Sequence, residues 1–107
     1  MQETTFLILT ALAGGSRHGY GIIIDVEKIS TGRVRLRAGT LYTALDRLRS
    51  DGLIEPEREE IVDNRLRRYY RLTGTGARRL AEEADRLRSN ARVAISRLDL
   101  NGGLATT

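Results

Sequence analysis

Several residue types that carry chemistry are absent from this chain or nearly so. Its 107 residues include no cysteine, no tryptophan and a single histidine. Without cysteine there can be no disulfide, no thiolate metal site and no cysteine nucleophile. The one histidine, His18, stands beside a glycine, where a packing or helix-start role is more common than metal binding or base catalysis. We therefore expect no metal, no cofactor and no enzymatic activity.

Long apolar segments are also lacking. No run approaches the roughly 20 residues that a membrane-spanning helix needs. The N-terminus has no basic region ahead of its short apolar stretch, as a secretion signal would have. The sequence therefore predicts a cytoplasmic protein that does not engage a membrane. A length of 107 residues fits one small domain with a modest core, to which self-association would add stability.

Positive charge is carried almost wholly by arginine. Lys28 is the only lysine, and 18 Lys and Arg residues against 14 Asp and Glu residues give a net charge of +4. Arginine binds phosphates and guanine edges with a planar fork, which favours a nucleic-acid partner. A GC-rich genome would produce the same bias through its codons. The clustering of arginines over residues 33–49 and 65–71 is therefore the better argument for a polyanion.

The most informative stretch is residues 39–54, GTLYTALDRLRSDGLI. Its apolar residues recur at helical spacing and predict a buried face formed by Leu41, Ala44, Leu45 and Leu48. Gly52 followed by Leu53 predicts a glycine C-cap for this helix. Two strands are expected next, over 54–62 and 66–72, joined by a turn at Asp63-Asn64.

Two other helices are expected earlier in the chain, over about 4–13 and 19–30, each ended by glycine. Residues 33–36 alternate charged and apolar side chains, which predicts a short strand. The order helix, helix, strand, helix, strand, strand is that of a winged helix-turn-helix. The fold class is accordingly α+β, mainly α, with a DNA-binding domain over residues 1–73.

A long helix is predicted over about 74–100, with Thr73 as its N-cap, followed by a flexible tail over 101–107. Its apolar positions alternate three and four residues apart, which is the seam of a helix that packs lengthwise on a partner. The helix could lie on its own domain, but a seam of about 39 Å is long for so small a body, which favours a contact between two copies. The expected dimerisation residues are Phe6, Leu80, Ala84, Leu87, Ala91, Ala94 and Leu98.

Four motifs resemble, in order and spacing, those of the PadR family of transcriptional regulators. They are HGYGI at 18–22, GTLY at 39–42 followed by Ala44-Leu45 and Arg47-Leu48, DGLI at 51–54, and RYYRLT at 68–73 followed by Gly76. The short form of that family has a winged-helix domain and one C-terminal helix that, with the first helix, builds a homodimer. Most members repress transcription by binding palindromic operators. The resemblance implies the same architecture, partner and function for this chain.

The chain also departs from the pattern of that family. Members often have a proline before and another after the GTLY motif, where this chain has Ala38 and Thr43. The first change loosens the turn into the helix, and neither removes the motif. Some members hold planar drugs between tryptophans at the dimer interface, which a chain without tryptophan is not expected to do. If an effector exists, we expect it to act near the dimer seam by changing the angle between the recognition helices.

The expected DNA contacts come from three parts of the chain. The N-terminus of the 39–51 helix can dock on a phosphate, since Gly39 permits close approach. Thr43 and Arg47 would meet base edges in the major groove, and the hairpin arginines would reach the flanking backbone or minor groove. Tyr20 is added by the family resemblance. The expected DNA-binding residues are Tyr20, Gly39, Thr40, Tyr42, Thr43, Arg47, Arg65 and Arg67.

Three points leave other interpretations open. Tyr42 could simply pack its ring on the domain. The acidic strand at 55–60 should pair with the arginine strand, which weakens the hairpin as a phosphate-binding element. A winged-helix module that binds protein instead of DNA would show exposed apolar anchors where this chain has arginines. The residues favour a dimeric, sequence-specific DNA-binding repressor.

Overall fold

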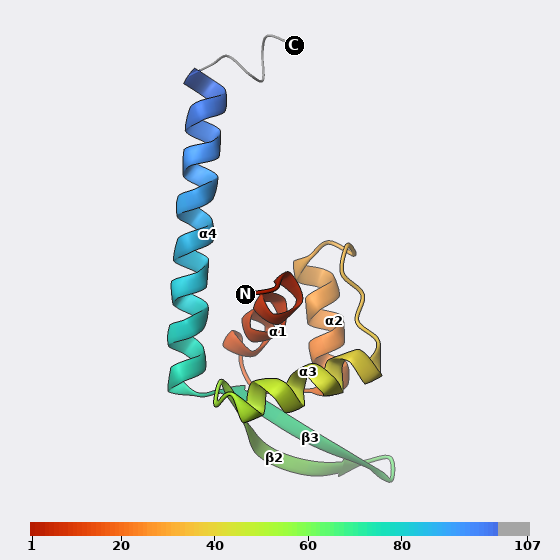
Figure 1. The fold of residues 1–107 in the computed structure, drawn as a ribbon. Coiled ribbons are helices and arrows are strands. Elements are labelled where there is room, and N and C mark those ends of the chain that lie inside the picture. Colours follow the sequence, from red (N-terminus) through yellow and green to blue (C-terminus); the bar gives the residue numbers. More distant parts are fainter. Residues whose placement is uncertain (101–107) are drawn as a thin grey trace.

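Four helices and three strands follow one another in residues 1–100, the part of the chain that the computed structural model describes (Figure 1). They are α1 (Glu3–Ala13), β1 (Arg17–His18), α2 (Gly19–Ile29), α3 (Ala38–Ser50), β2 (Ile54–Val62), β3 (Arg65–Leu72) and α4 (Gly74–Leu100). The strands form one antiparallel sheet in the order β1-β3-β2. This is the predicted α+β, mainly α winged-helix architecture.

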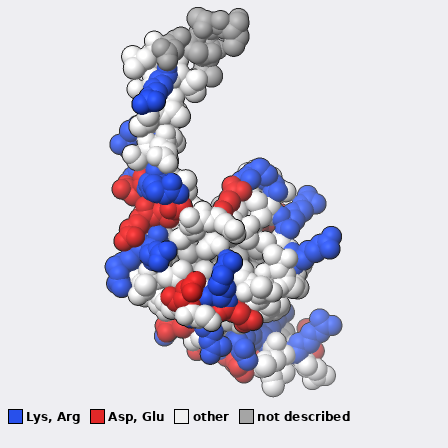
Figure 2. Space-filling model, in the orientation of Figure 1, with Lys and Arg blue, Asp and Glu red and all other residues white. Residues whose placement is uncertain are grey.

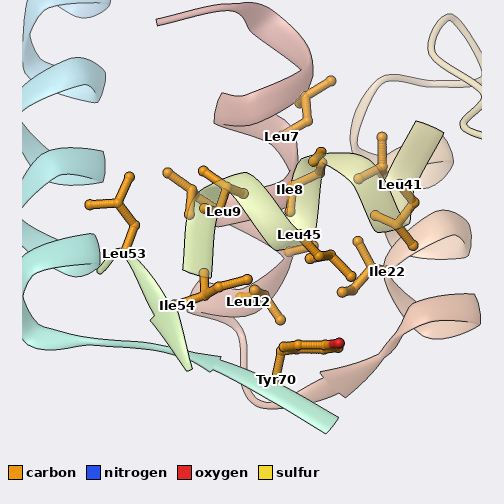
Figure 3. Close-up of a cluster of buried hydrophobic side chains, with 14 residues drawn as sticks. Leu7, Ile8, Leu9, Leu12, Ile22, Leu41, Leu45, Leu53, Ile54 and Tyr70 are labelled. Carbon is orange, nitrogen blue, oxygen red and sulfur yellow. The ribbon is translucent and has the colours of Figure 1, made fainter. Parts of the chain in front are cut away.

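The core lies between α1, α2, α3 and the sheet (Figure 3). α3 buries the four side chains that its spacing predicted. α1 is apolar on nearly every side because it packs against the other elements at the centre of the domain, and Ile8 and Leu9 on it are fully buried. The other large contributors are Leu12, Ile22, Val26, Leu53, Ile54 and Tyr70. Each such side chain stabilises the fold by about 1.5–3 kcal/mol when removed from water.

α3 ends at the predicted glycine cap. Gly52 has a positive φ of 75°. The Gly52 N–H donates to the Arg49 carbonyl, and the Leu53 N–H donates to the Leu48 carbonyl, each at 3.0 Å. This pair of bonds is a Schellman motif, in which the left-handed residue reverses the chain. β2 therefore starts directly beside the end of α3.

The hairpin turn also has the predicted chemistry. Asp63 and Asn64 both have positive φ, 52° and 61°. A two-residue loop with two left-handed residues is a type I′ turn, whose twist matches that of the strands it joins. Val62 and Arg65 are accordingly the first cross-strand pair.

One predicted strand is wrong. Residues 33–36 form no strand, and the third strand of the sheet is Arg17–His18, which pairs with β3. The alternation in 33–36 arises because Val34 and Leu36 pack against the core while Arg33 and Arg35 are exposed. The Val34 N–H donates to the Ser30 hydroxyl at 2.9 Å, so its hydrogen bond goes to a side chain instead of a neighbouring strand.

α4 starts on the domain and then leaves it (Figure 1). The Thr73 hydroxyl accepts from the Gly76 N–H at 3.0 Å, which confirms Thr73 as the N-cap. Leu80 packs against the core of its own domain, and all residues from Ala84 to Leu100 are exposed. The predicted tail, 101–107, lies outside the described residues. No helix within residues 1–100 has the length and apolar character needed to cross a membrane.

Candidate nucleic-acid interface

The start of α2, α3 and the hairpin enclose a hollow of about 380 Å³, here called the wing hollow. It is lined by His18, Gly19, Tyr20, Tyr42, Arg65, Leu66, Arg67 and Arg68. Half of the predicted DNA-binding residues, Tyr20, Tyr42, Arg65 and Arg67, therefore meet at one place, although they come from three elements. Tyr20 and Tyr42 are 66% and 50% exposed, so both side chains are accessible to a ligand.

Tyr42 owes its position to a glycine. A Cβ placed on Gly19 would lie 2.6 Å from the Tyr42 hydroxyl oxygen and 3.0 Å from the ring carbon that bears it. A larger residue at position 19 would push the Tyr42 ring away from the start of α2. Part of the Tyr42 side chain thus packs on the domain, and the rest is accessible to solvent, which is common for an amphipathic side chain.

The acidic and basic strands of the hairpin pair as predicted. Arg71 Nε donates to Glu55 Oε1 at 2.9 Å, and Arg68 Nε donates to Glu59 Oε1 at 3.2 Å. Arg65 and Arg67, by contrast, make no ion pair with any carboxylate within residues 1–100. The hairpin therefore pairs Arg68 and Arg71 with glutamates and leaves Arg65 and Arg67 without an ion pair within the described residues.

His18 lies at the base of the wing hollow against Tyr69. The two ring centroids are 5.2 Å apart, and the Arg58 guanidinium lies 3.9 Å from the Tyr69 centroid. Burial of His18, together with the positive charge of Arg67, lowers its pKa below the usual 6.5, and Glu60 only partly opposes this. His18 is therefore mainly neutral near pH 7. No group of three or more potential metal ligands occurs within residues 1–100.

Stability is expected to decrease as the pH falls from about 7.5 to 5.5. Because the folded-state pKa of His18 lies below 6.5, the unfolded chain binds more protons over this range. The contribution of neutral His18 is complete above pH 6.5 and is lost as the pH falls through the lowered value. Urea midpoints at the two pH values, for wild type and His18→Gln, measure this effect. Equal pH dependence in both proteins would contradict it.

The other half of the predicted DNA-binding residues line a second hollow, of about 440 Å³, between α3 and the start of α1. We call it the α1–α3 hollow, and its lining residues are Gln2, Thr4, Thr5, Gly39, Thr40, Thr43, Ala44 and Arg47. None of these side chains is acidic. At 100° per residue, Tyr42 and Arg47 lie on opposite flanks of α3, with Thr43 and Asp46 between them. The predicted contacts thus occupy both flanks of one helix.

Three features of this surface were missed by sequence reasoning. Thr5 and its neighbours on α1 line the second hollow, and no local pattern links them to α3. Asp46 lies on the outward face of α3, as the helical period alone could have indicated. Ile61 and Leu66 are cross-strand partners near the turn and are 76% and 60% exposed. The register of a two-residue turn at 63–64 would have revealed that aliphatic pair.

Charge is distributed unevenly over the face shown in Figure 2. Blue side chains project from the side of the domain that faces away from α4, whereas blue and red side chains lie together on the lower part of α4 and beneath the domain. The exposed loop arginines Arg33 and Arg35 are paired with Glu3 and Glu27. Arg37, just before α3, has no carboxylate partner within residues 1–100. Positive charge therefore flanks the start of α3 as well as the hairpin tip.

Known proteins are similar to this chain in sequence and in fold. The model of the transcriptional regulator PadR-like family matches residues 8–82. Transcriptional regulator Rv3488 of Mycobacterium tuberculosis is 40% identical over 77 residues, which are 72% of this chain and 58% of that regulator. The chain thus spans little more than half the length of that relative.

Solved structures agree with this match. A PadR family transcription regulator from Clostridium difficile R20291 superimposes with a TM-score of 0.75 at 26% identity, covering 91% of this chain and 99% of that one. Bacillus subtilis PadR, solved in complex with operator DNA, gives a TM-score of 0.69 at 23% identity over 78% of this chain and 47% of that one.

The family match runs from the middle of α1 to the first turns of α4, so it includes the wing hollow, the hairpin and the α3 side of the α1–α3 hollow. Its description, like that of the Mycobacterium relative, is of transcriptional regulators and not of enzymes, as the sequence predicted. With its winged-helix core and the matched motifs in place, the chain belongs to the PadR-like family of transcriptional regulators.

Proposed function

We propose that this protein is a homodimeric, sequence-specific DNA-binding repressor that recognises a palindromic operator. The observation that carries the proposal is the wing hollow, whose lining includes two exposed tyrosines and two arginines that make no ion pair within residues 1–100. Arginine and tyrosine are among the side chains that donate hydrogen bonds to DNA phosphates. The same fold in Bacillus subtilis PadR was solved in complex with operator DNA.

α3 would enter the major groove beside this phosphate contact. Gly39 lies in the first turn of α3, and a Cβ there would meet nothing within 4 Å, so the helix end can approach a strand closely. Thr40, Thr43 and Arg47 follow on the exposed surface of the helix. Arginine to guanine is the commonest specific contact in the major groove. α3 would therefore supply sequence preference, and the hairpin would supply mainly electrostatic affinity.

A second copy of the chain would cover the outer part of α4. Leu87, Ile95 and Leu98 are 42%, 58% and 44% exposed, and the seam alanines Ala84, Ala91 and Ala94 lie with them on one side of the helix. An apolar groove of about 280 Å³ runs between α1 and α4 and is lined by Met1, Glu3, Phe6, Leu7, Glu83 and Leu87. A two-fold dimer would place two α3 helices about 34 Å apart and read an inverted repeat. Occupancy of such a site at a promoter would repress transcription.

Measurements of DNA affinity can distinguish an arginine that recognises a base from one that contacts the phosphate backbone. We expect Arg47→Ala to weaken the preferred duplex by roughly 1–3 kcal/mol, with little effect on a scrambled one. Arg65→Ala or Arg67→Ala should weaken both duplexes similarly and reduce the salt slope by about 1. The duplex would first be selected from genomic fragments by the purified protein. Fluorescence anisotropy across a salt series then measures all variants.

Arg71→Ala is a matched control for the hairpin variants. Arg71 lies on β3 as Arg65 and Arg67 do, but it is paired with Glu55 and lines neither hollow. Its removal should leave the salt slope unchanged. Equal affinity of wild type for selected and scrambled duplexes at every salt concentration would leave only a nonspecific basic protein.

The exposed pair Ile61 and Leu66 favours one alternative, a module that binds protein. Aliphatic side chains on a projecting hairpin are the type of anchor that protein interfaces bury. Failure of the purified dimer to bind any fragment in the genomic selection would move the assignment to this alternative.

A further inference from the structure

A threonine from another helix holds the guanidinium of Arg47. Arg47 Nη2 donates to Thr5 Oγ1 at 3.2 Å, between residues 42 positions apart in the chain. Thr5 lies on α1 and is only 9% exposed, whereas Arg47 is an exposed residue of α3. Both line the α1–α3 hollow with Thr40 and Thr43. An anchored hydroxyl thus contacts the residue that we expect to recognise a base.

The partner of Arg47 is neutral although an acidic one is near. Asp51 follows Arg47 by one helical turn, and the two line a smaller neighbouring hollow of about 220 Å³. Arg47 nevertheless makes no ion pair with Asp51 or any other carboxylate within residues 1–100. A carboxylate would cancel the charge that attracts DNA, and a hydroxyl orients the guanidinium without doing so. With one N–H donated to Thr5, four remain for a ligand.

We propose that Thr5 is a positioning residue for DNA recognition, which holds Arg47 in the orientation that reads a base. An exposed arginine samples many rotamers, and fixing it before binding removes part of the entropy lost in the complex. The first turns of α1 thereby belong to the recognition surface together with α3. This inference rests on the proposed function, in which Arg47 contacts a base edge.

A double-mutant cycle tests the role of Thr5. Thr5→Val keeps the shape of the buried side chain and removes its hydroxyl. We expect it to lower the preference for the selected duplex over one altered at the Arg47-dependent base pair by about fivefold. In an Arg47→Ala background the same change should have no further effect, because Thr5 acts through Arg47. Thr5→Ser, which restores the hydroxyl, should recover most of the preference.

Thr10→Val is the matched control. Thr10 lies on the same helix, but its hydroxyl donates to the Phe6 carbonyl of its own backbone at 2.7 Å. Its removal should leave DNA preference unchanged. Thermal unfolding of every variant tests whether Thr5 contributes only to stability. In that case Thr5→Val would lower the melting temperature and leave the DNA preference unaltered.

The outcomes distinguish this inference from the proposed function. If Arg47→Ala retains full preference for the selected duplex, Arg47 does not recognise a base, and the positioning role of Thr5 is refuted as well. If Arg47→Ala loses preference and Thr5→Val keeps it, the proposed function stands and the positioning role is refuted. An equal loss of affinity for all duplexes in Thr5→Val, not rescued by serine, would also overturn the inference.

Discussion

Gly76→Ala is expected to destabilise the fold by about 3 kcal/mol, a large part of the stability of a small domain. Gly76 is buried in the first turn of α4, where a Cβ would collide with the backbone carbonyl of Leu53. The carbonyl carbon lies 2.9 Å from that position and the Leu53 Cα 3.2 Å from it. These are backbone atoms, so no side-chain rotation relieves the collision. Alanine would favour the helix by up to about 1 kcal/mol, and the collision exceeds this gain.

Thermal unfolding followed by circular dichroism measures the effect, which should lower Tm by more than about 10 °C. Gly39→Ala is the matched control, since Gly39 also lies in the first turn of a helix and a Cβ there meets nothing within 4 Å. That variant should be as stable as wild type or more so. A Gly76→Ala protein with wild-type Tm would mean that α4 does not pack against Leu53 in solution.

Leu87→Asp combined with Leu98→Asp is expected to convert the proposed dimer into monomers that retain a folded winged-helix domain. Both leucines are exposed on the α4 seam, Leu87 at the groove between α1 and α4 and Leu98 further along the helix. A buried carboxylate without a partner is strongly unfavourable, so the seam cannot close around it. The freed outer half of α4 should lose helical structure, because an isolated helix of this length is marginal in water. Analytical ultracentrifugation and far-ultraviolet circular dichroism report the two effects.

Val93→Asp provides the comparison for the seam variant. Val93 is 48% exposed, close to the values for Leu87 and Leu98, but it lies on the opposite side of α4. Its substitution should leave the dimer intact. Leu80 is a poorer probe, because it packs on the core of its own domain, so a charge there would also destabilise that domain. Dimers that persist in the Leu87→Asp, Leu98→Asp protein would exclude the seam as the interface.

Elements with a strong period or a defined turn chemistry were predictable from the sequence. The buried face of α3, the glycine cap at Gly52 and the turn at Asp63-Asn64 follow from side-chain spacing and from backbone preference alone. β1 was not predictable, because two residues carry no period and Arg17–His18 become a strand only by pairing with β3. The pattern of 33–36 was misleading, since burial on one side produces the same alternation without a sheet.

The candidate site was predictable in its residues but not in its arrangement. Motif resemblance and charge predicted Tyr20, Tyr42 and the hairpin arginines, which do meet in the wing hollow. Tyr42 and Arg47 line different hollows, because the start of α2 and the hairpin pack on one flank of α3 and α1 packs on the other. The sequence does not show this tertiary packing. The contact of Arg47 with Thr5 joins residues 42 positions apart, and nothing in either local sequence indicates it.

The end of α3 and the start of α4 are connected without a hinge. The Thr73 hydroxyl donates to the Gly52 carbonyl at 2.6 Å, and the Thr73 N–H donates to the Leu53 carbonyl at 3.1 Å. Gly76 lies directly against the same backbone. A tilt of α4 would therefore turn α3 with it as one rigid body. In a dimer, the angular freedom between the two α3 helices would then reside where the α4 helices cross, so a molecule that spreads this crossing would change the half-site spacing that the protein accepts.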